Sequence, residues 1–255
     1  KHFRAEFSLD FIRRNQSNPF FLYVATTIPH KNFEVPELTP YADKPWPEDA
    51  KAFAAMVTRL DTHVGKIMSL LKELDLDEKT FVFFTSDNGS AKGWEGVFDS
   101  CGPLRDKKFS LYEGGVRCPM IVRRPGMTAP GAVRNAVWYF ADFLPTAASL
   151  AGATVPETVD GIDVAPLLRG DVSSLPQRFL YWELVQGDTG RLRQAVRWGD
   201  WKAVRQKMLQ KGNTDPLRIE LVQRIPGYRA PRLGIPPHDL VRVGCHNLAN
   251  ARLKS

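Results

Sequence analysis

The sequence predicts an α/β fold in which helices flank a mostly parallel sheet, with a smaller C-terminal subdomain built on an antiparallel sheet. Apolar runs at residues 20–27 and 81–85 enclose a long amphipathic segment, and strand, helix, strand in that order is typical of a parallel βαβ unit. From about residue 176, short aromatic-rich segments alternate with turns, which indicates antiparallel strands. The predicted divisions are residues 1–175, 176–220 and an irregular basic tail at 221–255.

The first half of the chain contains two predicted helices. Phe3, Phe7 and Phe11 recur at every fourth position and predict a helix at the start. A longer helix begins at Glu48 and Asp49, whose charges favour a helix N-terminus. Its apolar stripe repeats every three or four residues and consists of Phe53, Met56, Val57, Leu60, Val64, Ile67, Leu71 and Leu74. His63 is expected on the polar side, and the Pro-rich residues 31–47 predict an irregular surface crossing.

The second half begins with a Gly-rich loop and a turn at Gly114-Gly115, which leads into a strand at about residues 120–123. A helix is predicted over about 142–150, ended by Gly152. The segments "FLYWEL", "QAVRWG" and "WKAVRQ" predict short antiparallel strands, with a turn at Gly199-Asp200.

Charge and composition exclude several classes of partner. The formal net charge is +7, but residues 217–255 hold seven Arg or Lys and two acids, so most of the excess lies in the tail. The rest of the chain shows no basic stripe interleaved with aromatics, which argues against nucleic-acid binding. No apolar run approaches the ~18 residues of a membrane span. Three cysteines give neither a disulfide framework nor a zinc pattern. The oligomeric state stays open.

Asp87-Asn88-Gly89 follows the apolar run "FVFFTS" and admits two interpretations. Asn-Gly is a strong hairpin-turn signal, although the run before it does not alternate as a half-buried hairpin strand would. Alternatively, a continuous apolar strand belongs to a sheet covered on both faces, where ligands gather at the carboxyl ends of strands. Asp87 and Asn88 would then offer neighbouring oxygen donors to a hard cation such as Ca²⁺ or Mg²⁺.

Two further positions could carry chemistry. His30 follows Pro29 just after the first apolar run, and Lys107 and Lys108 form a pair in the later loop. Taken singly, His30 is typical of a solvated loop histidine and the two lysines are typical of a solvated face.

The order of these features resembles the sulfatase family of the alkaline-phosphatase-like superfamily. A strand ending in Pro-His is followed by the helix "AAMVTRLDTHVGKIMSLLKEL", by "TSDNG" and by "GPLRDKKFSLYEGGVRCPMIV". The resemblance covers roughly residues 3–221 and implies a sulfuric ester hydrolase with an alkaline-phosphatase-like fold, in which residues 1–175 are the later part of the catalytic domain.

The resemblance also implies a role for each candidate residue. Asp87 and Asn88 match two metal ligands, normally for Ca²⁺, with Mg²⁺ as an alternative. His30 matches a histidine that contacts the sulfate ester and assists the leaving group. Lys108, four residues before Tyr112, matches a lysine that contacts the sulfate, and its neighbour Lys107 does not. The string from Tyr112 to Arg117 matches a family motif, for which we expect a structural role in which Glu113 pairs with Arg117.

The sequence departs from the family at its nucleophile. Sulfatases use a formylglycine made from Cys or Ser in a Cys-x-Pro-Ser-Arg type motif, which lies upstream of the Asp-Asn pair, and these 255 residues do not contain it. Cys101-Gly102-Pro103-Leu104-Arg105 fits Cys-x-Pro-x-Arg but follows the Asp-Asn pair, so Cys101 is interpreted as a loop thiol. We therefore expect the later part of a longer protein, inactive alone. A shifted reading frame near Leu221 would explain the Arg-rich tail.

Two other functions stay open from the sequence. One is a phosphate or phosphonate ester hydrolase of the same superfamily, and the other is a non-catalytic binding domain that kept the fold. The resemblance implies a sulfate ester small molecule or a sulfated sugar as substrate, and a periplasmic or secreted location.

Overall fold

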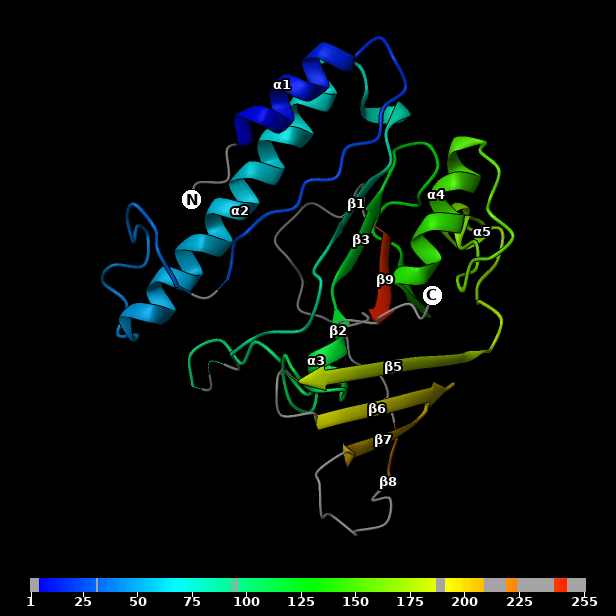
Figure 1. Cartoon of the computed structure of the whole chain (residues 1–255). Helices are drawn as coiled ribbons and strands as arrows, with labels where there is room; N and C mark the ends of the chain where they lie inside the picture. The colour runs from blue at the N-terminus through cyan, green and yellow to red at the C-terminus, as the bar shows by residue number, and fades with distance from the viewer. Residues whose placement is uncertain are drawn as a thin grey trace. The chain divides into compact units, whose positions relative to one another are not determined.

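The computed structural model describes residues 5–30, 32–92, 94, 96–186, 191–208, 219–223 and 241–246. These residues form two compact units, one over residues 1–80 and one over residues 81–255 (Figure 1). Among the described residues no helix is long and apolar enough to cross a membrane.

The first unit is helical and agrees with three of the predicted features. Helix α1 spans Ala5–Asn15 and packs against α2, which spans Glu48–Glu73. A short 3-10 helix, η1, follows at Asp77–Lys79. The irregular crossing before α2 is held on it by the Phe33 and Phe53 rings, 5.7 Å apart, and by a 2.8 Å hydrogen bond between Tyr41 and Thr58. The two helices and the irregular crossing are therefore confirmed.

Two expectations for this unit are wrong. Residues 20–27 form no strand, and Phe21 and Tyr23 are 69% and 80% exposed. An apolar run becomes a strand when a neighbour takes up its backbone hydrogen bonds, and no described strand pairs with this segment. His63 is buried, with 8% of its surface exposed, instead of lying on the polar side of α2. Burial and the nearby charges of Arg59 and Lys66 lower the pKa of His63.

The second unit opens with a five-stranded sheet. Its strands are β1 (Val82–Thr85), β2 (Arg117–Cys118), β3 (Met120–Arg123), β4 (Val133–Tyr139) and β9 (Val241–His246). The order is β1-β3-β9-β2, and β4 also pairs with β9. β9 lies within residues 221–255, for which the sequence predicts an irregular tail. Most of that tail lies outside the described residues.

The strand directions in this sheet differ from the predicted parallel arrangement. β1 pairs with β3, β3 with β9 and β2 with β9 in antiparallel fashion, and the β4–β9 pair is parallel. The predicted parallel partner of β1 was the run at residues 20–27, which forms no strand. A mostly parallel sheet is therefore not what the described strands form.

Helices cover this sheet and complete its core. The 3-10 helix η2 (Phe140–Asp142) runs into α4 (Phe143–Ala151), and α5 spans Ala165–Arg169. α4 ends at Gly152, whose φ of 68° is the left-handed helix cap that the sequence predicts. The buried core between strands and helices consists of Cys118, Met120, Val122, Trp138, Val164, Leu167 and Leu168.

The C-terminal part of the chain forms the predicted antiparallel sheet, within the same unit as residues 81–175. Its strands β5 (Phe179–Gln186), β6 (Arg191–Trp198), β7 (Trp201–Met208) and β8 (Ile219–Gln223) pair in chain order, all antiparallel. The turn between β6 and β7 falls at Gly199, with φ 57°, as predicted. The predicted turn at Gly114-Gly115 is instead a single helical turn, α3 (Glu113–Val116), which lies beside this sheet (Figure 1).

Candidate functional site

The Asp87-Asn88-Gly89 segment leaves the end of β1 and docks directly on α3. The amide of Gly89 donates to the carbonyl oxygen of Gly115 over 3.0 Å. A side chain at Gly89 would overlap the carbonyl oxygen of Gly114 and lie 2.8 Å from its carbon. Gly89 is therefore required by close backbone contact, and no hairpin forms here because β1 pairs with β3. The interpretation of Asn88-Gly89 as a hairpin turn is therefore wrong.

The loop that carries the two lysines lies against the same backbone. The amide of Lys108 donates to the carbonyl oxygen of Ser90 over 2.9 Å. The amide of Gly114 donates to the carbonyl oxygen of Arg105 over 2.8 Å. A Cβ on Gly114 would lie 2.6 Å from the Arg105 oxygen, and one on Gly115 would lie 2.7 Å from the Lys107 oxygen. Residues 87–90, 105–110 and α3 therefore meet through their backbones, and we call this contact the glycine junction.

The glycine junction brings three of the predicted site residues into one neighbourhood. Asp87 and Asn88 directly precede Gly89, and Lys108 is bonded through its backbone to Ser90. Asp87 is exposed, whereas Asn88 and Lys108 are half-buried. Lys107 is exposed and its amide donates to the Asp106 carboxylate over 2.9 Å. The two lysines therefore differ in burial, and the choice of Lys108 over Lys107 as the functional one stays a prediction.

His30, the fourth predicted residue, is exposed and follows the cis peptide between Ile28 and Pro29. It belongs to the unit of residues 1–80, whereas Asp87, Asn88 and Lys108 belong to the unit of residues 81–255. The predicted convergence of His30 with the other three residues stays a prediction.

The donor chemistry at residues 87 and 88 fits a hard divalent cation. A carboxylate and an amide oxygen are the ligand types that Ca²⁺ and Mg²⁺ prefer, and the backbone that carries them is fixed by the glycine junction. Within the described residues no group of three or more His, Cys, Asp or Glu side chains could hold a metal ion. Asp87 and Asn88 would therefore form part of a metal shell.

A buried cluster of charges holds α3 from its other side. The Glu113 carboxylate lies 2.9 Å from the Lys202 ammonium and 3.3 Å from the Arg197 guanidinium. Burial lowers the pKa of Lys202, and the attraction of Glu113 opposes that shift. Glu113 was expected to pair with Arg117, which stays a prediction, and the pairing with Arg197 and Lys202 was not predicted.

The strand periodicity contained a signal for the missed cations. Arg197 shares its sheet face with Ala195, and Lys202 shares its face with Val204, both of which are buried. A charged side chain at an apolar position of an alternating strand is stabilised by an opposite charge. Arg197 and Lys202 in this pattern therefore indicate an acidic partner, although the strands alone do not say which.

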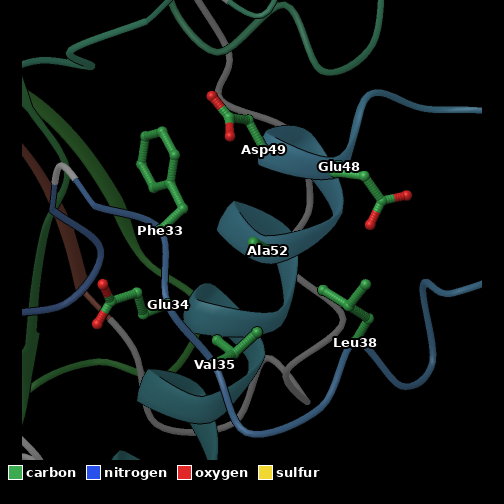
Figure 2. A pocket seen from close by; sticks show the side chains of 7 residues that line it. All are labelled: Phe33, Glu34, Val35, Leu38, Glu48, Asp49 and Ala52. Atoms are coloured by element: carbon green, nitrogen blue, oxygen red, sulfur yellow. The ribbon is translucent and has the colours of Figure 1, made fainter.

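A pocket of about 360 Å³ lies elsewhere, in the unit of residues 1–80, and none of the predicted site residues lines it (Figure 2). It is lined by Phe33, Glu34, Val35 and Leu38 of the crossing segment and by Glu48, Asp49 and Ala52 of α2. Three carboxylates at one pocket oppose the binding of an anion such as a sulfate ester. The pocket is therefore not part of the candidate site.

Comparisons with known proteins cover most of the chain. The family described as Sulfatase matches residues 4–153, and the family described as N-sulphoglucosamine sulphohydrolase, C-terminal matches residues 103–211. The chain is 36% identical over 203 residues to N-acetylgalactosamine-6-sulfatase of Canis lupus familiaris, and 37% identical over 191 residues to arylsulfatase A of Homo sapiens. These matches cover 77% and 74% of this chain and 36% of each relative, so the chain spans about a third of their length.

Solved structures agree with the sequence comparisons. The structure of the PsFucS1 sulfatase from Pseudoalteromonas sp. is similar with a TM-score of 0.62 at 27% identity, over 86% of this chain and 43% of that one. This similarity confirms the alkaline-phosphatase-like α/β class that the resemblance implied. Because the Sulfatase match extends over more than half of the residues, the chain belongs to the sulfatase family.

Proposed function

We propose that this chain supplies the later metal ligands and the sulfate-binding lysine of a sulfatase that hydrolyses sulfate monoesters. The glycine junction carries the proposal, because it joins the Asp87-Asn88 segment to the loop of Lys108 through backbone contacts between distant parts of the sequence. Membership of the sulfatase family supports the reaction class.

Each residue has a chemical role in this proposal. Asp87 and Asn88 would hold Ca²⁺, or Mg²⁺ in its place, through a carboxylate and an amide oxygen. A bound divalent cation supplies positive charge that polarises the sulfate ester. The Lys108 ammonium would contact the non-bridging sulfate oxygens and offset their negative charge. His30 would donate a proton to the leaving oxygen, for which an imidazole has a suitable pKa.

The nucleophile is the part of the reaction that the described site does not supply. Cys101, a half-buried thiol in the loop before the lysines, lies in a motif that matches Cys-x-Pro-x-Arg by sequence alone. We propose that formylglycine serves as the nucleophile, as the family resemblance implies, and that Cys101 has no catalytic role.

Substrate and location follow from the resemblance alone. We propose that the ester is a small sulfate ester or a sulfated sugar, and that the protein acts in the periplasm or outside the cell. Fractionation of the native host, followed by detection of the gene product, tests the location, and recovery in the cytoplasmic fraction would contradict it.

A calcium titration of the purified chain tests the metal site. The backbone amide NMR shifts of Gly89 and Ser90 report binding, since these residues follow the two proposed ligands. We expect Asp87→Ala to weaken calcium binding by at least about tenfold, because even residues that only orient ligands cost about 10- to 100-fold.

The control for this titration is Asp171→Ala, which removes an exposed carboxylate that is paired with Arg169 over 2.9 Å, away from the junction. This variant should bind calcium like the parent chain. Equal calcium affinity in the parent and in Asp87→Ala would refute the metal assignment.

A further inference from the structure

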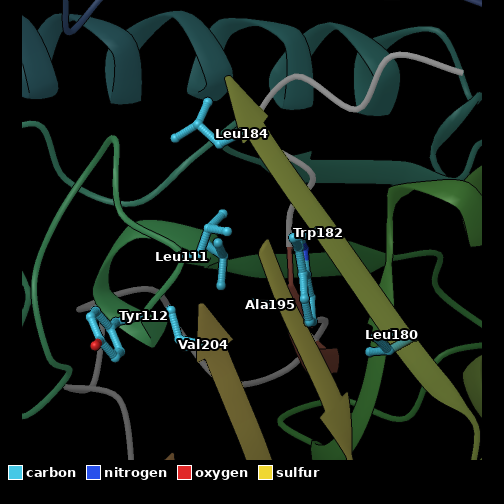
Figure 3. Close-up of a cluster of buried hydrophobic side chains, with 8 residues drawn as sticks. Leu111, Tyr112, Leu180, Trp182, Leu184, Ala195 and Val204 are labelled. Carbon is cyan, nitrogen blue, oxygen red and sulfur yellow. The ribbon is translucent and has the colours of Figure 1, made fainter. Parts of the chain in front are cut away.

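Helix α3 lies between the candidate site and the C-terminal sheet. On one side its backbone forms the glycine junction with residues 87–90 and 105–110. On the other side, the apolar face of the sheet packs on residues just before and within α3 (Figure 3). The buried cluster there consists of Leu111, Tyr112, Val116, Leu180, Trp182, Leu184, Ala195 and Val204. The C-terminal sheet therefore packs directly against α3, which contacts the candidate site through its backbone.

The buried charges fix this contact in a specific geometry. The side chains of Arg197, Lys202 and Glu113 are 3%, 4% and 10% exposed, so water scarcely reaches them. Lys202 also lies 4.5 Å from the centre of the Trp182 ring, and the Arg197 Nε donates to the Gly199 carbonyl over 2.8 Å. Hydrogen bonds between buried charges are directional and costly to break, so Glu113 is held at one position relative to β6 and β7.

Glu113 is connected to the candidate site by closely packed main-chain contacts. Gly114 and Gly115 follow Glu113 directly, and a single added carbon on either would collide with residues 105–110. Their peptide groups bond to Gly89 and Arg105 at 3.0 and 2.8 Å. A shift of α3 would therefore displace both the Asp87-Asn88 segment and the Lys108 loop. A second link runs from β6 to the loop, because Arg193 donates to the carbonyl oxygen of Phe109.

We propose that Arg197 and Lys202 of the C-terminal sheet are positioning residues for the metal and sulfate site, acting through Glu113 and the glycine junction. This inference rests on the proposed function, since it concerns the same site. The C-terminal sheet would then help to orient Asp87, Asn88 and Lys108, which lie in loops outside that sheet.

The variant Lys202→Met separates positioning from overall folding. Methionine fills much of the lysine volume against Trp182 and leaves Glu113 and Arg197 as a neutral pair, which limits the cost to global stability. Glu113→Gln is less suitable because it would leave two buried cations without an anion. Arg197→Met provides a second variant that leaves the Glu113–Lys202 pair.

Two readouts follow the site in these variants. Hydrogen exchange at the amides of Gly89 and Lys108 should accelerate by about fivefold or more, the change that loss of one buried hydrogen bond would produce. Calcium affinity in the same NMR titration should fall by about tenfold, as for residues that orient metal ligands. Exchange in α2, which belongs to the other unit, should stay unchanged.

The control is Arg178→Met, which breaks an ion pair of the same unit whose carboxylate is fully buried and whose arginine is 19% exposed. Arg178 bonds to Asp142, whose side chain is fully buried and also accepts from the amides of Tyr139 and Ile162 at 2.9 Å. This variant should lower the unfolding temperature without changing calcium affinity or the exchange of Gly89.

The outcomes distinguish this inference from the proposed function. If Asp87→Ala weakens calcium binding but both sheet variants bind it like the parent, positioning by the sheet is wrong and the metal site stands. If Asp87→Ala has no effect on calcium affinity, the proposed metal site is wrong, and the positioning inference that rests on it is wrong as well. If Arg178→Met weakens calcium binding as much as Lys202→Met, the effect reflects general destabilisation and the inference is overturned.

Discussion

At the scale of single residues, the two neighbouring lysines differ in burial and in the partner of their backbone amide. Lys108 is half-buried and its amide is bonded to Ser90, whereas Lys107 is exposed and its amide turns back to Asp106. The proposed contact of Lys108 with an anion would need less ordering of the chain, because the backbone of Lys108 is already fixed at the junction. The lysine that stays in water has no such advantage.

This difference gives a paired prediction. Inorganic sulfate in the presence of calcium should shift the amide resonances of residues 87–90 in the parent chain and in Lys107→Ala. In Lys108→Ala we expect the apparent sulfate affinity to drop by about tenfold, because a hydrogen bond to a charged group contributes about 1.5–3 kcal/mol. Equal losses in both lysine variants would show that the sulfate responds to net charge and not to a particular ammonium.

At the scale of elements, α3 is a single helical turn that cannot accept side chains at its glycines. Gly114→Ala would place a carbon against the carbonyl oxygens of Arg105 and Asp106. We expect it to reduce the free energy of unfolding by about 3 kcal/mol, since backbone yields less readily than side chains in an overpacked site. Chemical denaturation measures the loss.

Gly65→Ala is the control for this substitution. Gly65 lies within α2 and an added Cβ there would meet nothing within 4 Å. Alanine has the higher helix propensity, so this variant should gain about 0.5–1 kcal/mol. A Gly114→Ala chain as stable as the parent would mean that the glycine junction is not close-packed.

The elements also show what the sequence could predict. The apolar stripe of α2 and the left-handed cap at Gly152 are local patterns, and both predicted their helices correctly. Residues 20–27 have the composition of a strand, but a strand depends on a partner that composition does not reveal. The bond between Glu113 and Lys202 joins residues 89 positions apart. Such a pair depends on how the C-terminal sheet docks on α3, which spacing along the chain does not encode.

The candidate site also contains residues that the sequence predicted and residues that it did not. Asp87, Asn88 and Lys108 were predicted from motifs, and the structure joins their segments through backbone bonds. Arg197 and Lys202 were not predicted because their partner, Glu113, lies on α3 and is far from them in the sequence. Sequence motifs therefore predicted the proposed ligand-binding residues, whereas the proposed positioning residues became visible only in the structure.

At the scale of the whole molecule, the chain spans 36% of the length of its curated relatives, and its 255 residues contain no Cys-x-Pro-Ser-Arg motif. Hydrolysis needs a nucleophile to attack the sulfur. We expect the purified chain to release no product from an aryl sulfate in the presence of calcium. Turnover by the chain that disappears in Asp87→Ala would contradict this expectation and would direct attention to Cys101.

The glycine junction has a consequence for which positions of this sequence can vary. Peptide groups are common to every sequence, so an architecture that relies on them persists while the surrounding side chains are exchanged. Side chains around the junction can therefore vary without breaking the contacts that join residues 87–90, 105–110 and α3. The three glycines, by contrast, should resist any replacement, because hydrogen is the one substituent that the crowded main chain admits.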